Sequence, residues 1–255
     1  MDYNIKQTFI QKWNQYFPNT ELPIVFFYTD DLNEEINYSP SSFRCIIDEL
    51  SRVRSGETVV FDAKTPMCAG GKRYMGFSQT LRPNFNYFLS CGIPGKLEGE
   101  RYKKTPEIVE EVMKDQPPYT APGKYIIFKR WDNLNVNDNP SVVIFFAAPD
   151  VLSGLFTLAN FDEIDRNAVI SPFASACSNL VYFPSIEAAS NTPKAILGMF
   201  DASARPYVTS SELTFAVPLS KFVRMINNMD ESFLITNTWK TIRNRITIES
   251  KTSKV

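Results

Sequence analysis

Glycine is concentrated in one stretch of this chain. Six of its ten glycines lie between Gly70 and Gly99. Because glycine adopts positive φ angles and lets backbones approach closely, we expect residues 65–99 to be mostly loop, with short elements at 73–77 and 84–89. The rest of the chain, with few glycines, is left to form regular helices and strands.

Apolar spacing predicts those helices and strands. Ile5, Phe9, Trp13 and Phe17 recur every four residues, which predicts an amphipathic helix that ends near Pro18. Apolar runs predict strands at 22–28, 58–61, 125–131, 142–147, 195–200 and 213–217. Further helices are predicted from Ser41 or Ser42 to Gly56, from Thr105 to before Pro117, from Pro149, and over 219–229 and 239–246. The fold class is therefore α+β or α/β, with mixed sheets and proline-started helices.

The segments 146–149 and 215–218 resemble each other, since each runs from a strand into a proline that starts a helix. Two explanations stay open: a duplication that gives two similar halves, and chance similarity. We expect one compact domain over residues 1–255. The proline-rich segment 117–123 is the place for any sub-division, because prolines favour an extended linker.

The composition is that of a globular protein, and it disfavours some classes of binding partner. Hydrophobic residues make up 44% and charged residues 22% of the chain, and the net charge is −1. Such a charge does not favour nucleic-acid binding, and the longest apolar run, 142–148, is too short to cross a bilayer. The four cysteines lack a dense spacing pattern, which indicates free thiols and a cytoplasmic location. A small-molecule ligand is the expected partner, and an oligomer stays open.

The chain contains no histidine. It therefore lacks both the usual neutral-pH base and the commonest metal ligand. Any chemistry must come from cysteine, carboxylate, lysine, arginine or tyrosine side chains, or from a bound cofactor.

Three of the four cysteines are candidate site residues. Cys45 points away from the apolar face of its predicted helix, Cys68 precedes the Gly70-Gly71 pair, and Cys177 lies among small residues. We expect Cys45, Cys68 and Cys177 to converge, with Cys91 apart in packing. A converged set would suit an iron–sulfur cluster or another thiolate-bound metal. Structural roles for these thiols stay open, and no C-x-x-C motif is present.

A second constellation lies in the segment 198–206. Asp201, Ser203 and Arg205 alternate after a predicted strand and would share one side if the extended backbone continues. We expect Arg205 to face a pocket and Asp201 to orient its guanidinium, which would grip a carboxylate or phosphate. A simple Asp–Arg staple of the loop is the alternative.

Several motifs resemble one family. The stretches G-E-T-V-V-F-D, C-A-G-G-K-R-Y-M-G-F, F-K-R-W-D-N-L, G-M-F-D-A-S-A-R-P and the two long segments 92–107 and 145–161 are similar to the uncharacterised prokaryotic ArCR family, domain of unknown function 169. The resemblance covers about Leu22 to Ile246. It implies no activity. It does imply cysteines matching Cys45, Cys68 and Cys177, and it leaves Cys91 outside the pattern.

Three functions remain open. The favoured one is the binding of a small anionic ligand in a pocket near the glycine-rich loop and Arg205, with Gly70, Gly71, Asp201 and Ser203 as further contacts. The second is a metal or iron–sulfur protein that uses Cys45, Cys68 and Cys177. The third is a thiol enzyme with Cys68 as nucleophile, which needs a base other than histidine.

Overall fold

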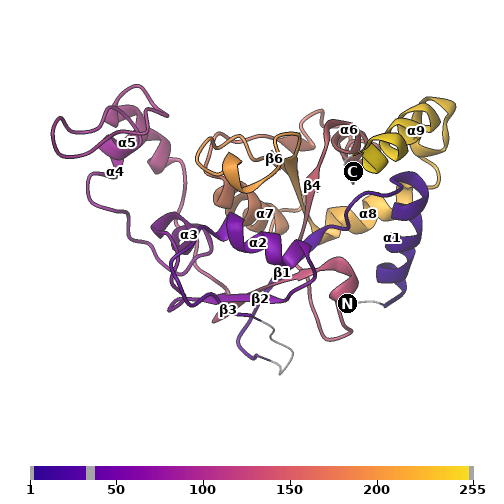
Figure 1. Cartoon of the computed structure of the whole chain (residues 1–255), viewed down its shortest axis with the longest axis horizontal. Helices are drawn as coiled ribbons and strands as arrows, with labels where there is room; N and C mark the ends of the chain where they lie inside the picture. Colours follow the sequence, from indigo (N-terminus) through magenta and orange to yellow (C-terminus); the bar gives the residue numbers. More distant parts are fainter. Residues whose placement is uncertain (1–2, 33–37, 253–255) are drawn as a thin grey trace.

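A single seven-stranded sheet organises the chain (Figure 1). The structure is a computed structural model and describes residues 3–32 and 38–252. The strand order is β2-β3-β1-β4-β7-β6-β5, and all neighbours are antiparallel except the β5–β6 pair. The strands are β1 (Ile24–Thr29), β2 (Val59–Asp62), β3 (Tyr125–Arg130), β4 (Val142–Ala147), β5 (Val169–Ile170), β6 (Ala195–Gly198) and β7 (Leu213–Pro218).

Helices cover the sheet and connect its strands. The α-helices are α1 (Tyr3–Tyr16), α2 (Ile46–Arg54), α3 (Ala69–Tyr74), α4 (Phe85–Phe88), α5 (Pro106–Lys114), α6 (Pro149–Ala159), α7 (Phe183–Ala188), α8 (Leu219–Asn228) and α9 (Asn237–Thr252). A π-helical segment, η2 (Ser178–Tyr182), runs directly into α7, and short 3₁₀ turns lie at η1 (Trp131–Asn133), η3 (Arg205–Tyr207) and η4 (Phe233–Ile235).

The centre of the sheet is buried on both faces. All six residues of β4 are buried, and their side chains alternate between two separate cores. Val143 and Phe145 enter one core, whereas Val142 and Ile144 enter the other, as the two-residue period of a strand requires.

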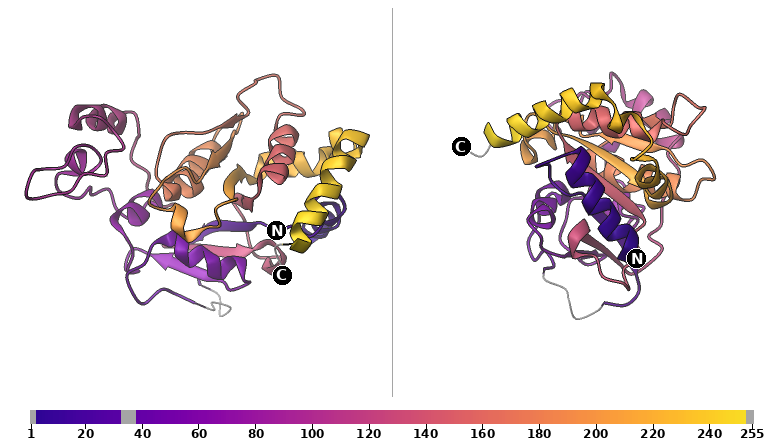
Figure 2. Two further views of the ribbon diagram at one scale, coloured as in Figure 1. Left: turned by 45° about the horizontal axis from the view of Figure 1, so that its top comes forward. Right: turned by 90° about the vertical axis from the view of Figure 1, so that its right-hand side faces the viewer.

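One core, which we call the aromatic face, is built by α1, α6, α8 and α9. Phe9 packs edge-on against Trp131 and Phe222, with ring centroids 5.0 and 4.9 Å apart. The first and last helices lie side by side (Figures 1 and 2), because Trp239 packs against Phe17 and its indole N–H donates to the carbonyl of Tyr16 at 3.0 Å.

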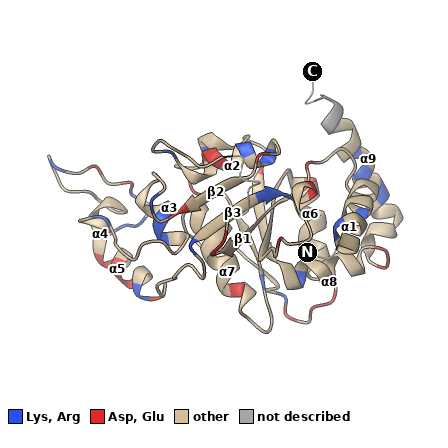
Figure 3. Ribbon diagram, turned by 90° about the horizontal axis from the view of Figure 1, so that it is seen from below, with Lys and Arg blue, Asp and Glu red and all other residues tan. Residues whose placement is uncertain are grey.

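The opposite core, which we call the thiol face, is built by α2, α3, η2 and α7. Ile46 and Leu50 of α2 pack there with Leu180 of η2 and Met199, which follows β6. Beyond this face, the segment with α4 and α5 projects from the body as an arm (Figures 1 and 2). Basic and acidic residues alternate over the ribbon in Figure 3, in agreement with the low net charge.

The α+β fold class is confirmed, and most predicted elements are present. Both proline-started helices form, and their preceding strands, β4 and β7, are antiparallel neighbours. The predicted start of the second helix at Ser41 or Ser42 is wrong, because the chain stays extended until Cys45 and α2 begins at Ile46. Ser171-Pro172 has the sequence of a helix cap and first turn, but the helical turn begins only near Ala176 and continues as the π-helical segment η2.

Two further sequence predictions concern chain organisation. Part of the predicted loop 30–40, residues 33–37, lies outside the described residues. The segment 117–123 runs against the body: Ala121 N–H donates to the carbonyl of Gly76 at 3.0 Å, and Gly123 lies against Thr29.

Over residues 3–32 and 38–252, no helix combines the length and apolarity that crossing a membrane requires.

The packing of α9 on α1 yields a stability prediction. Trp239→Ala should lower the free energy of unfolding by about 3–5 kcal/mol, because the side chain is 2% exposed and leaves a large cavity. Ile248→Ala on the same helix is the control, since Ile248 is 66% exposed and such substitutions change stability by about 0.5 kcal/mol or less. Urea denaturation measures both, and equal effects would contradict the docking of α9.

Candidate functional site

Cys45 and Cys68 begin two neighbouring helices. Each occupies the N-cap position, of α2 and α3 respectively, with extended backbone. The residues just before them, Arg44 and Met67, form a parallel β-bridge. This register places the two cysteines opposite each other. Cys68 Sγ also accepts the N–H of Gly71 at 3.3 Å.

Cys177 approaches the same place from the start of η2. A side-chain carbon added at Gly70 would lie 3.9 Å from its sulfur, so the first turn of α3 packs on this thiol. Burial raises the pKa of Cys177, and the thiols of Cys68 and Cys45 contribute to the rise. Burial also raises the pKa of Cys45, with Cys68 contributing, whereas the amides of Ile47 and Asp48 oppose the shift.

The structure thus brings Cys45, Cys68 and Cys177 together. Cys91 is exposed and lies on the projecting arm. Within residues 3–32 and 38–252, no group of three or more Cys, Asp or Glu side chains is arranged to hold a metal ion. A metal or cluster at the three thiols therefore stays a prediction from the sequence.

Asp201 and Arg205 serve the loop that contains them. Asp201 accepts the N–H of Ala176 at 3.1 Å and both the N–H and hydroxyl of Ser203, so it ties this loop to the start of the helix at η2. The Arg205 guanidinium donates to the carbonyls of Thr209, Ser210 and Glu212. This geometry is that of a loop staple in which the arginine grips backbone carbonyls rather than Asp201. A ligand contact by Arg205 remains a prediction.

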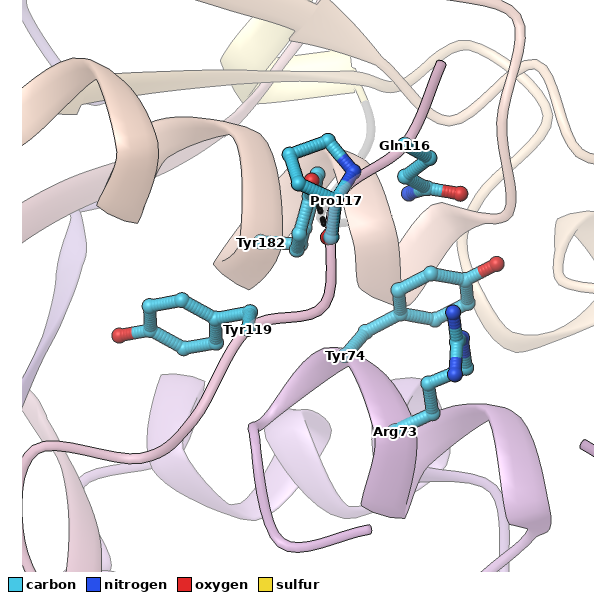
Figure 4. Close-up of a pocket in the computed structure, with 6 residues that line it drawn as sticks. All are labelled: Arg73, Tyr74, Gln116, Pro117, Tyr119 and Tyr182. Carbon is cyan, nitrogen blue, oxygen red and sulfur yellow. Dashed lines mark hydrogen bonds between the residues drawn. The ribbon is translucent and has the colours of Figure 1, made fainter. Parts of the chain in front are cut away.

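A small pocket lies beside the thiols, on the other side of Tyr74. It is shallow: the space of about 170 Å³ among its side chains includes open solvent and encloses no room for a water molecule. Figure 4 shows its lining. α3 supplies Arg73 and Tyr74, and η2 supplies Tyr182, whose hydroxyl donates to the carbonyl of Pro117 at 2.8 Å. Gln116 and Tyr119 complete the lining from the segment that follows α5.

Tyr74 connects this pocket to the thiols. Burial raises the pKa of Tyr74 to about 12, the nearby Cys177 adds to the rise, and Arg73 opposes it. Ser175, which also interacts with Tyr74, lies with its hydroxyl 3.3 Å from the sulfur of Cys177. The pocket and the thiols therefore share one wall.

The sequence interpretation missed the lining residues. Arg73 and Tyr74 lie two and three residues after Gly71, and this closeness to the glycine pair was the available signal. Tyr119 stands in the proline-rich segment 117–123, which the sequence marks only as the place of a possible sub-division and which also lines the pocket. Tyr182 gave no signal, because it belongs to a π-helical segment whose period differs from that of an α-helix.

Gly70 and Gly71 give a matched pair of predictions. A side-chain carbon at Gly71 would lie 3.0 Å from Cγ2 of the fully buried Ile46, so Gly71→Ala should cost about 1–3 kcal/mol of folding stability. At Gly70 the added carbon meets only ordinary contacts at 3.9 Å, and Gly70→Ala should leave stability unchanged or raise it by about 0.5–1 kcal/mol. Thermal and urea unfolding measure the difference, and equal stabilities would contradict the packing of α3 on α2.

Comparison with known proteins identifies a family. A model of the family described as DUF169, uncharacterised ArCR, matches residues 19–228. The match begins after α1 and ends with α8, so it includes the whole sheet, the three converging cysteines and the pocket. No curated protein and no solved structure matches the chain. The chain belongs to the DUF169 family of uncharacterised ArCR proteins.

Proposed function

We propose that the protein binds a small carboxylate in the pocket between α3 and η2. The observation that supports this most strongly is the placement of one arginine, Arg73, against a wall of three tyrosines, Tyr74, Tyr119 and Tyr182. This site lies on the glycine-rich segment, where the sequence predicted an anion site, but its cation is Arg73 rather than Arg205.

The charge balance of the pocket favours an anion. Arg73 donates to the backbone carbonyl of Gln79 at 2.7 Å, and among the described residues no acidic side chain forms an ion pair with it. Burial raises the pKa of both Tyr74 and Tyr182, so these phenols stay neutral at physiological pH. The arginine is thus the charged group of the lining, and its planar fork suits a carboxylate.

The size and walls of the pocket favour a compact, planar ligand. The lining side chains enclose no space wide enough for a water molecule, so a ligand has to be small and has to part these side chains as it enters. Aromatic rings provide flat apolar surface for a planar body. One guanidinium balances one negative charge, so a monocarboxylate fits better than a phosphate dianion.

Benzoate is a suitable probe, because it combines a planar ring with one carboxylate. Titration into ¹⁵N-labelled protein should shift the amide resonances of α3, Gln116 and Tyr119. Arg73→Ala should weaken binding about tenfold or more, because a hydrogen bond to a charged group contributes about 1.5–3 kcal/mol. The benzoate affinity of Arg73→Lys should lie between those of the native protein and Arg73→Ala, because lysine keeps the charge and loses the planar fork.

Arg82→Ala is the matched control. Arg82 lies on the arm with its guanidinium 4.0 Å from the ring centre of Phe88, away from the pocket lining. This variant should bind benzoate as the native protein does. Equal binding by native protein and Arg73→Ala, or no saturable benzoate binding by the native protein, would overturn the proposal.

A further inference from the structure

A pair of thiols stands in register on the thiol face. The parallel bridge between Arg44 and Met67 places the next residues, Cys45 and Cys68, on adjacent extended segments. Neighbouring strands lie about 4.8 Å apart, and disulfide-bonded cysteines have Cα atoms about 4.4–6.8 Å apart. The side chains at opposed positions of such a pair share one side, so the two sulfurs can meet without a large backbone movement.

The surroundings of the pair differ from those of the third thiol. Cys45 and Cys68 are both partly exposed, whereas Cys177 is buried behind the first turn of α3. A reagent from solvent therefore reaches Cys45 and Cys68 before it reaches Cys177. Cys91 is exposed but lies on the arm.

We propose that Cys45 and Cys68 form a redox-active dithiol that closes reversibly to a disulfide. The proposal rests on the register of the two segments, on the partial exposure of both thiols, and on the donation of the Gly71 N–H to the sulfur of Cys68. The dithiol is a separate proposal from carboxylate binding in the pocket and does not depend on that binding.

A small disulfide, such as oxidised glutathione, is the oxidant. The Cys68 thiolate attacks one sulfur of this disulfide, forms a mixed disulfide and releases one small thiolate. The Cys45 thiol then loses its proton and attacks Cys68 Sγ, which forms the Cys45–Cys68 bond and expels the second small thiolate. Two electrons pass from the two cysteine sulfurs to the glutathione disulfide, and the two cysteine protons are taken up by the released thiolates.

Cys68 is the better first nucleophile of the two. Its sulfur accepts the N–H of Gly71 at 3.3 Å, and this hydrogen bond holds the Cys68 sulfur in place for the attack. Burial raises the pKa of Cys45, which keeps that thiol protonated until the mixed disulfide stands beside it. Cys45 therefore acts second.

The test is mass spectrometry of the full chain after incubation with oxidised glutathione. Formation of the Cys45–Cys68 bond should remove two hydrogen atoms from the native protein, apart from any glutathione added at the exposed Cys91. Non-reducing peptide mapping should find Cys45 linked to Cys68. Dithiothreitol should restore the original mass. Cys45→Ser should stop at the mixed disulfide and gain one glutathione at Cys68.

Cys91→Ser is the matched control and should give the same Cys45–Cys68 link as the native protein. Mapping of the native chain does not depend on whether a variant folds, and circular dichroism checks each variant. A link that joins Cys177 to Cys45 or Cys68, a link through Cys91, or no link at all would overturn the proposal.

Discussion

Burial of the central strands on both faces is the constraint from which the rest of the structure follows. Strands such as β4 carry apolar side chains on both faces, so each face needs its own cover of helices. On the aromatic face, the helices α1, α6, α8 and α9 cover the sheet. On the thiol face, shorter segments cover the sheet, namely α2, α3 and η2 with α7. These segments must start close together because they cover the same strands.

That crowding creates the candidate site. Three segments far apart in the sequence reach the thiol face at Cys45, Cys68 and Cys177. Burial raises the pKa of Cys45 and Cys177, and neighbouring thiols add to both rises. The short helix α3 lies at the centre of this arrangement. Cys68 precedes its first turn, its two glycines pack against the neighbouring segments, and Arg73 and Tyr74 at its end line the pocket. The thiol pair and the pocket therefore depend on one small element.

The sequence predicted the sheet well because apolar runs and proline-started helices are local patterns, as with the strand and helix around Pro149. It failed at η2, whose period is not that of an α-helix, and at Arg205, whose partners are carbonyls of its own loop. Arg73 was missed because the residues that line the pocket with it, such as Tyr119 and Tyr182, come from segments that are distant in the sequence.

The central claim is that the helices of the thiol face place the Cys45 and Cys68 side chains next to each other. Dibromobimane tests it directly, because this reagent becomes strongly fluorescent only when it bridges two neighbouring thiols. The account predicts that the reduced, native protein becomes fluorescent, with Cys45 and Cys68 in one bridged peptide, and that prior unfolding in urea abolishes the preference. Bridges distributed equally among all four cysteines, or no fluorescence from the native protein, would contradict it.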